Sequence, residues 1–327
     1  MRIKLMIRSF LVKHPRLYDV LYYFYSLIVD FNGREHEYKN AVKKENIVYY
    51  VIRPRTNCIE GLLSLFIFIM KKYEYAIRKN YMPIIDLKNY VTQYSNGRDN
   101  VWEWFFTQPN NLTLDEVYAS ENKVILSGYK WNSTEDADLF SNKIFYDKSL
   151  NAICNHLILD NFCYSSEIEQ LLDKEIKDLL IEQCIGVYLR GTDYVKLKPA
   201  GESIQPTVDM VIDKIWEFSK KYNNPPIFLV TEDRTIYEKI KSVFSSKLRL
   251  VSFDSFIDNY DGKDFLSKSN VFTKDMKTVG MEYLTKMILL SKCKYLISSI
   301  TCGSRVSYVL NGNKYEDKYI FDLGLYQ

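Results

Sequence analysis

Short apolar runs alternate with helix-patterned segments through the second half of the sequence, and this alternation constrains the fold more than any other feature. The runs of strand length lie at 185–189, 227–230, 248–253, 295–297 and 319–321. Segments that begin near 207, 234 and 276 carry apolar residues at helical spacing between them. Strands that alternate with helices indicate right-handed crossovers and a mainly parallel sheet.

The first half shows the same order once. A buried strand at 47–52 precedes a helix that starts after Gly61, and a strand at 83–87 follows. This is the pattern of a βαβ unit. A third strand is expected at 124–127, and residues 133–184 are expected to be helical. We therefore predict an α/β protein of two Rossmann-like domains, 1–183 and 184–327, with a cleft between them.

Composition excludes several classes of function. A net charge of +3 over 327 residues, with no basic stripe in the body of the chain, gives no case for nucleic acid as a partner. The six cysteines show no CxxC spacing, which indicates reduced thiols in a cytoplasmic protein. The three histidines are at 14, 36 and 156, so no histidine base or metal ligand lies after residue 184.

The N-terminal segment 1–30 is basic at its start. Five basic residues precede the first acid: Arg2, Lys4, Arg8, Lys13 and Arg16. No apolar run in it approaches the roughly 20 residues of a membrane span. Two readings remain open: peripheral contact with an anionic membrane surface, or an ordinary helix packed on its own domain with a solvated basic face.

The run at 185–189 ends abruptly in Arg190, Gly191, Thr192 and Asp193. Ligands of open parallel sheets bind at the carboxyl ends of the strands. A guanidinium at such an end suits phosphate or carboxylate, because its forked donors engage two oxygens at once. The alternative is that Arg190 and Asp193 simply pair with each other across a turn.

Polar residues follow the other strands of the second half as well, and together they predict a site on one rim of the sheet. They are Thr231, Glu232, Asp233, Asp254, Ser299, Thr301, Cys302, Gly303 and Ser304. The last four open a helix, where free backbone N–H groups and the helix dipole favour a phosphate. The alternative there is that Ser and Thr serve only as N-caps, which is their commoner use.

The sequence lacks the fingerprints of other nucleotide enzymes. It has no GxxxxGK[ST] and no strand-linked GxGxxG, which argues against P-loop and dinucleotide enzymes. No DxD triplet follows a strand, and Glu232-Asp233 is more readily explained as a solvated turn than as a metal site. An arginine and a helix start in place of a metal motif suit a metal-independent nucleotide-sugar transferase.

Residues 188–193, reading YLRGTD, resemble the HxRRxD motif of the fucosyltransferase superfamily. That superfamily includes nodulation-type and core α-1,6-fucosyltransferases and relatives of the protein O-fucosyltransferases. Residues 227–233 resemble its second motif, a strand that ends in a threonine and two acids. Residues 289–310 resemble its third. The resemblance covers about 184–310, with the three blocks in the order that the family keeps.

This resemblance implies a GT-B fold, a GDP-sugar donor held mainly by the second domain, inversion at the anomeric carbon, and neither a metal nor a cofactor. Arg190 matches the family arginine that holds the β-phosphate. Tyr188, Gly191 and Thr192 would join the polar residues above in binding the donor. The chain departs from the pattern at three positions: Tyr188 replaces histidine, Gly191 replaces the second arginine, and Lys198 occupies the position of a proposed catalytic glutamate.

We therefore expect an inverting fucosyltransferase that uses GDP-fucose or a similar GDP-sugar. Its acceptor would be a bacterial surface glycan or a lipid-linked precursor, assembled at the cytoplasmic face of the membrane. Glu202 is expected as general base and Asp193 as the group that orients Arg190, with Asp86 and Glu103 next in line as bases. The alternative is a non-catalytic nucleotide-sugar-binding or membrane-associated scaffold protein, which Lys198 favours.

Overall fold

The computed structural model describes residues 17, 33–39, 47–55, 60–129, 136–258, 260–266, 269 and 271–327. These residues belong to two compact units. The first comprises the described parts of Met1–Leu139 together with His156–Glu167, and the second comprises Phe140–Asn155 and the described parts of Ile168–Gln327. Most of the predicted membrane-contact segment, residues 1–30, lies outside the described residues.

The first unit is built on a four-stranded sheet in the order β1-β4-β2-β3. Its strands are β1 (His36–Lys39), β2 (Val48–Ile52), β3 (Met82–Ile85) and β4 (Lys123–Leu126). Strand β2 pairs in parallel with β3 and β4, whereas β1 is antiparallel to β4. The predicted strands at 47–52, 83–87 and 124–127 are confirmed within one or two residues at each end.

Helices of the first unit owe their form to burial and capping. Helix α3 (Leu62–Arg78) is apolar almost all round its first half, as expected of a helix buried in a core. Helix α4 (Leu114–Ala119) begins with a capping box in which Thr113 and Glu116 satisfy each other's backbone N–H groups. Its Leu114 and Val117 pack on apolar residues of β2, β3 and β4. The short 3₁₀ helices η1 (Val101–Trp104) and η2 (Pro109–Asn111) lie between β3 and α4.

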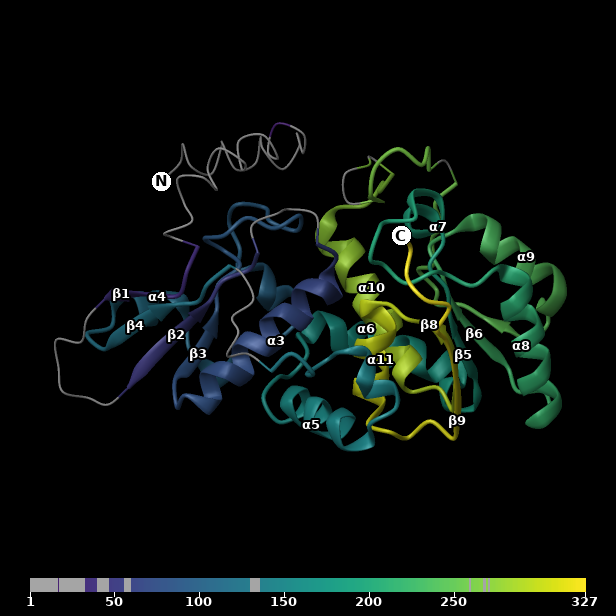
Figure 1. Ribbon diagram of the computed structural model, residues 1–327, viewed down its shortest axis with the longest axis horizontal. Helices are drawn as coiled ribbons and strands as arrows, with labels where there is room; N and C mark the ends of the chain where they lie inside the picture. The colour runs from purple at the N-terminus through teal and green to yellow at the C-terminus, as the bar shows by residue number, and fades with distance from the viewer. Residues whose placement is uncertain are drawn as a thin grey trace. The chain divides into compact units, whose positions relative to one another are not determined.

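The second unit contains a five-stranded parallel sheet in the order β7-β6-β5-β8-β9 (Figure 1). Its strands are β5 (Ile185–Tyr188), β6 (Ile227–Val230), β7 (Leu248–Arg249), β8 (Tyr295–Ser299) and β9 (Asp317–Phe321). Between β5 and β9 the chain forms α7 (Thr192–Leu197), α8 (Val208–Lys221), α9 (Arg234–Phe244), α10 (Met276–Ser291) and α11 (Cys302–Asn311). The predicted parallel α/β architecture is confirmed in this unit.

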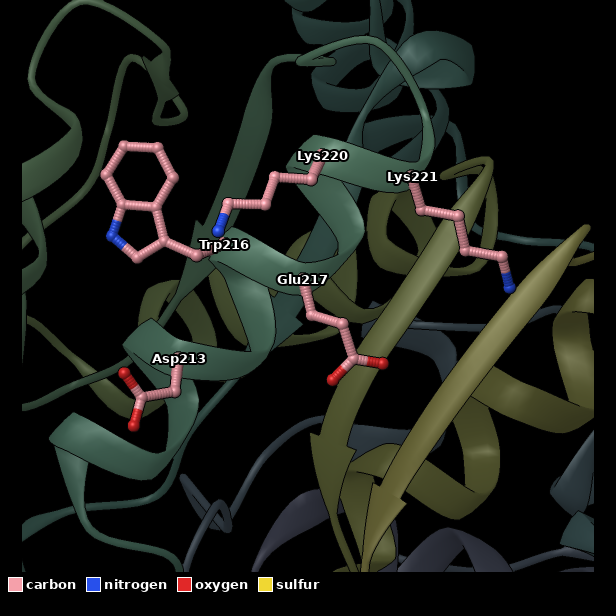
Figure 2. A pocket seen from close by; sticks show the side chains of 5 residues that line it. All are labelled: Asp213, Trp216, Glu217, Lys220 and Lys221. Atoms are coloured by element: carbon pink, nitrogen blue, oxygen red, sulfur yellow. The ribbon is translucent and has the colours of Figure 1, made fainter.

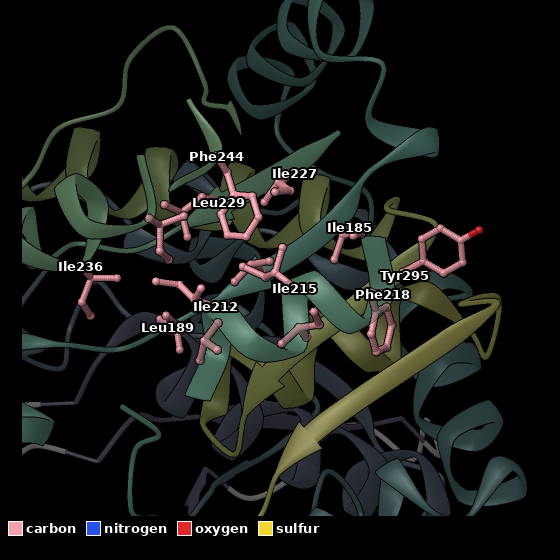
Figure 3. Close-up of a cluster of buried hydrophobic side chains, with 14 of the residues drawn as sticks. Ile185, Leu189, Ile212, Ile215, Phe218, Ile227, Leu229, Ile236, Phe244 and Tyr295 are labelled. Atoms are coloured by element: carbon pink, nitrogen blue, oxygen red, sulfur yellow. The ribbon is translucent and has the colours of Figure 1, made fainter. Parts of the chain in front are cut away.

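Helices cover both faces of this sheet. Residues of α8 and α9, among them Ile212, Ile215 and Phe244, pack on Ile185 and Leu229 in one apolar cluster (Figure 3). Figure 1 shows α10 and α11 on the opposite side of the same strands. A side chain at Gly186 would meet Leu290 of α10 at 2.6 Å, so glycine lets α10 lie directly on β5. Burial on both faces explains why these strands read as continuous apolar runs.

Three expectations about the elements need correction. The expected helical segment 133–184 is divided within its described part, residues 136–184, because η3 (Asn142–Phe145), α5 (Lys148–Leu159), α6 (Ser166–Leu179) and η4 (Ile181–Gln183) are separated by turns. The predicted strand at 248–253 is paired only at Leu248 and Arg249. Residues 140–155 and 168–183, which we had assigned to the first domain, pack with the second unit.

Among the helices that the structure describes, none is both long and apolar enough to span a membrane.

Candidate active site

The order of the second sheet defines where a ligand should bind. From β5 the chain adds β6 and then β7 on one side, and it adds β8 and β9 on the other side. The direction of winding therefore reverses between β5 and β8. Such a switch point opens a crevice at the carboxyl ends of the two strands. Tyr188 at the end of β5 pairs in register with Ser298 of β8, so the segments that start at Leu189 and Ile300 leave the sheet side by side.

Arg190 lies at this edge between two carboxylates. Its Nη2 donates to Asp193 Oδ1 at 2.7 Å, and its Nε is 3.6 Å from Glu232 Oε1. The ring of Tyr194 lies 4.3 Å from the guanidinium carbon. The side chain remains 22% exposed, which leaves part of the fork open to a ligand. Burial lowers the Arg190 pKa, but Glu232 and Asp193 outweigh it and place that pKa well above its usual value.

Both oxygens of Asp193 accept hydrogen bonds that hold the loop after β5. Asp193 is 3% exposed, and its Oδ1 also accepts from the Tyr194 backbone N–H at 3.0 Å. Its other oxygen, Oδ2, accepts from the Leu266 backbone N–H at 3.2 Å. The pairing of Arg190 with Asp193, which we had considered as the alternative to a ligand site, is therefore present. It fixes one side of the guanidinium, which fits the predicted orienting role.

Thr192 adopts a strained backbone conformation at the start of α7. Its φ is +38°, a region that costs a β-branched residue about 1–3 kcal/mol. Two acids that follow β6 hold it there. Asp233 Oδ2 accepts from the Thr192 N–H at 3.1 Å, and Glu232 Oε1 accepts from its Oγ1 at 2.9 Å and from the Gly191 N–H at 3.0 Å. These acids cap α7 from a neighbouring strand, and Thr231 Oγ1 accepts from the Asp233 N–H in turn.

Tyr188 fills the place of the family histidine and is buried toward α10. Its hydroxyl lies 3.1 Å from the hydroxyl of Tyr283, and burial raises the pKa of both phenols. Gly303 of α11 fits against this pair: a Cβ there would lie 2.6 Å from the Tyr283 hydroxyl and 2.8 Å from the Tyr188 ring. The predicted residues Tyr188 and Gly303 are thus in direct contact. No sequence pattern pointed to Tyr283, because only the packing of α10 brings it here.

Helix α11 begins with a reciprocal cap. Thr301 Oγ1 accepts from the Ser304 N–H at 3.0 Å, and Ser304 Oγ accepts from the Thr301 N–H at 2.8 Å. These two side chains therefore act as N-caps, as the alternative reading proposed. The N–H groups of Cys302 and Gly303 belong to the first turn, where a helix supplies no backbone acceptor. Cys302 is partly exposed, and its Sγ accepts from Arg305 Nη2 at 3.1 Å.

The side chains of two further predicted residues bond to other side chains of the protein. Ser299 is fully buried and donates from Oγ to Gln205 Oε1 at 2.6 Å. Asp254 forms an ion pair with Lys286 of α10, and both side chains are largely buried. Burial raises the Asp254 pKa while Lys286 opposes that rise. A role for either residue in donor binding stays a prediction.

Glu202, the expected base, is exposed on a loop that is tied to the C-terminal segment. Backbone hydrogen bonds join Gly201 N–H to Tyr326 O, Tyr326 N–H to Glu202 O, and Ile204 N–H to Gly324 O, at 2.9 to 3.0 Å. A swing of this loop over a donor would break three hydrogen bonds, which does not fit a freely moving lid. The Glu202 carboxylate does act electrostatically on Tyr194, so it lies near the ring that faces Arg190.

Carboxylates of the first unit differ in how fully they are bound. Asp86 is completely buried and accepts from the Lys88 and Asn89 backbones, the Asn89 amide and the Tyr118 hydroxyl. Glu103 Oε1 accepts from the side-chain amides of Asn100 and Gln108.

Sequence reasoning missed Glu60, whose environment is different. Its Oε1 pairs with Arg55 and accepts from Ser64 Oγ, whereas its Oε2 is buried and accepts no hydrogen bond from the residues that the structure describes. Burial raises the Glu60 pKa against the opposing effect of Arg55.

A hollow on the outer side of α8 is not part of this edge (Figure 2). It is lined by Asp213, Trp216, Glu217, Lys220 and Lys221. Lys221 Nζ is 2.8 Å from an oxygen of Asp317, the first residue of β9. The hollow therefore lies toward the amino ends of the parallel strands, away from the switch point. In the described part of the chain, no group of three or more His, Cys, Asp or Glu residues is arranged to hold a metal ion.

The fold was compared with those of known proteins. A structure of NodZ α-1,6-fucosyltransferase co-crystallised with GDP matches with a TM-score of 0.50 and 16% identity, over 81% of this chain and 93% of that one. The chain has a fucosyltransferase-like fold. The likeness to this superfamily that residues 188–193 indicated is thereby confirmed for the architecture.

Two other solved structures are similar at lower scores. NodZ from Bradyrhizobium gives a TM-score of 0.49 at 17% identity, over 81% of this chain and 94% of that one. A variant of Arabidopsis thaliana FUT1 in complex with GDP gives a TM-score of 0.47 at 13% identity, over 86% of this chain and 72% of that one. No family model and no curated protein sequence matches the chain.

Proposed function

We propose that the chain is an inverting, metal-independent glycosyltransferase that moves fucose from GDP-fucose to a glycan. The observation that carries the proposal is Arg190, a partly open guanidinium held by Asp193 at the switch point of the second sheet. The fucosyltransferase-like fold supports the choice of sugar nucleotide, because the matching NodZ structure was co-crystallised with GDP.

In this reaction an acceptor oxygen bonds to the anomeric carbon of fucose as the bond from that carbon to the diphosphate breaks. Negative charge builds on the departing GDP. Arg190 would stabilise it through the open side of its fork, and the first-turn N–H groups of α11 would add a second source of positive potential. Because Asp193, Glu232 and the Tyr194 ring fix the guanidinium beforehand, little reorganisation is needed at the moment of transfer.

The proposal is tested by incubating the protein with GDP-fucose and measuring GDP release, first with water as acceptor and then with a panel of oligosaccharides. Transfer gives a glycan whose mass has increased by one fucosyl residue. A protein that binds GDP-fucose but never releases GDP would instead be the non-catalytic binding protein. That alternative is favoured by Lys198, an exposed residue in the left-handed conformation at the end of α7, where the family resemblance implied a glutamate.

The proton of the acceptor hydroxyl must pass to a base as the hydroxyl attacks, and we propose Glu202 for this role. Glu202→Gln should keep GDP-fucose affinity and lower the rate of GDP release about 100-fold or more, the usual size of a general-base contribution. Glu60→Gln is the paired variant, since Glu60 has one anchored oxygen and one that accepts no hydrogen bond from the described part of the chain. A normal rate in Glu202→Gln together with a large loss in Glu60→Gln would move the base to Glu60.

Activity should not depend on a divalent metal ion. We expect the initial rate of GDP release to be unchanged in excess EDTA, because protein cations and helix N–H groups would neutralise the diphosphate. The rate is measured before and after chelation and again after adding Mn²⁺ or Mg²⁺. Loss of activity that either metal restores would point to Glu232 and Asp233 as ligands and would contradict this part of the proposal.

The biological setting follows from the same proposal. We propose that the acceptor is a bacterial surface polysaccharide or its lipid-linked precursor, and that the enzyme works in the cytoplasm at the membrane face. The basic residues at the start of the chain support peripheral contact with anionic lipid. Sedimentation with anionic and with neutral vesicles, using the full chain and a variant whose basic residues before Asp19 are changed to glutamine, tests that contact.

A further inference from the structure

The carboxyl group of Glu232 presents its two oxygens to different surroundings. Its Oε1 accepts from the Gly191 N–H and the Thr192 hydroxyl and lies 3.6 Å from Arg190 Nε. Apart from a contact with the residue's own backbone N–H, the donors that the structure gives this carboxylate all reach Oε1. The side chain is still 24% exposed. One oxygen is thus anchored to the loop, whereas Oε2 accepts no hydrogen bond from any other residue that the structure describes.

Burial of Glu232 disfavours its ionised form more than the neighbouring Arg190 charge favours it. The titratable groups that face it are Arg190 and Tyr188 from the β5 end and Asp193 from α7, and Asp233 follows it in the chain. Burial raises the Glu232 pKa, Asp193 raises it further, and Arg190 and the Thr192 hydroxyl oppose the rise without cancelling it. The Glu232 pKa is therefore already raised before any ligand arrives.

A diphosphate on Arg190 would bring two more negative charges to the same guanidinium. Like charges at hydrogen-bond distance repel strongly in a partly buried site, and protonating one of them removes the repulsion. A protonated Glu232 gains a hydrogen-bond donor on its open oxygen, and that O–H suits a phosphate oxygen. Oε1 meanwhile keeps its bonds to Gly191 and Thr192, so the loop need not change.

We propose that Glu232 meets the bound diphosphate as a neutral carboxylic acid, so that the site takes up one proton together with the nucleotide sugar. This inference rests on the proposed function. In this proposal Glu232 binds the diphosphate of the donor by donating a hydrogen bond, and not by holding a metal ion. Because the bound state favours the protonated acid, affinity should fall as pH rises through the Glu232 pKa of the free protein, by up to about tenfold per pH unit.

Calorimetric titration of GDP-fucose into the full-length protein tests the proposal. Titrations at one pH near neutrality, in three buffers that differ in ionisation enthalpy, give the number of protons taken up from the slope of the observed heat. GDP-fucose is used rather than GDP because its diphosphate is esterified at both ends, whereas a terminal phosphate itself titrates near pH 6. We expect uptake that approaches one proton in the wild type.

Two variants show whether the proton taken up on binding goes to Glu232. Glu232→Gln keeps an acceptor for Gly191 and Thr192 and should bind GDP-fucose with no linked proton and with little change in affinity from pH 6 to 8. Glu238→Gln removes one negative charge from the exposed side of α9 and should behave as the wild type does. Wild-type heats that do not depend on the buffer, or a linked proton that persists in Glu232→Gln, would overturn the inference. No binding of GDP-fucose by the wild type would overturn the proposed function itself.

Discussion

Replacing Arg190 by alanine should lower the rate of GDP release from GDP-fucose by about 100-fold or more, the scale of losing one preorganised charge-stabilising group. The loss should be larger in turnover than in donor affinity, because charge on the leaving diphosphate grows toward the transition state. Steady-state rates of GDP release give the comparison. A folded Arg190→Ala protein with near-normal turnover would remove this residue from the mechanism.

Two further variants show whether a positive charge at position 190 is enough for activity. Arg190→Lys should recover little activity, because an ammonium lacks the fork that reaches Asp193 and a phosphate together. Arg78→Ala is the matched control: it removes an arginine that is about half exposed on α3 and forms an ion pair with Glu74 one turn away. Its rate should equal that of the wild type. Full rescue by lysine would show that geometry at Arg190 is unimportant.

Replacing Gly191 by alanine should disturb both the fold and the site. A Cβ at this position would lie 2.5 Å from Cβ and Oδ2 of Asp233, the residue that caps α9 and holds the strained Thr192. Overpacking of this kind costs about 1–3 kcal/mol. We expect the free energy of unfolding, measured by chemical denaturation, to fall by about 2 kcal/mol and GDP-fucose affinity to fall with it.

The same contact leaves no room at position 191 for the second arginine of the motif that residues 188–193 resemble. Gly191→Arg, which would restore that arginine, should destabilise the protein at least as much as Gly191→Ala does, because both add the same Cβ. Gly61→Ala serves as the control, since none of the described residues comes within 4 Å of its Cβ position. Stability and turnover equal to those of the wild type in Gly191→Arg would refute this explanation.

Much of the fold could be predicted because local pattern and tertiary burial agree. The apolar runs that became β5, β6 and β8 are buried on both faces, and the spacing in α9 and α10 matches a helix that covers a sheet. Helix α7 could not be predicted in this way. Its six residues gain their caps from Glu232 and Asp233, which are about 40 residues further along the chain.

The site could be predicted in outline and not in detail. That polar residues gather at the carboxyl edge follows from strand order, and Arg190, Asp193 and Glu232 do meet there. Which oxygen bonds to which donor depends on side-chain packing that a linear pattern does not contain. Ser299 bonds to Gln205, and Thr301 and Ser304 bond to each other, although the sequence placed all three toward a ligand. The contacts of Tyr194 with Arg190 and of Tyr283 with Tyr188 could be identified only from the structure.

We expect a GDP-sugar to bind at the edge formed by β5 and β8. A thermal-shift panel of nucleotide sugars measures this binding. The wild type and Arg190→Ala are heated with equal concentrations of GDP-fucose, GDP-mannose, a UDP-sugar and a dTDP-sugar. A ligand that binds only the folded state raises the melting temperature. We expect a rise with GDP-fucose that exceeds the rise with the UDP- and dTDP-sugars and is much smaller in Arg190→Ala. Equal rises with all four ligands, or a GDP-fucose rise that Arg190→Ala retains in full, would contradict this expectation.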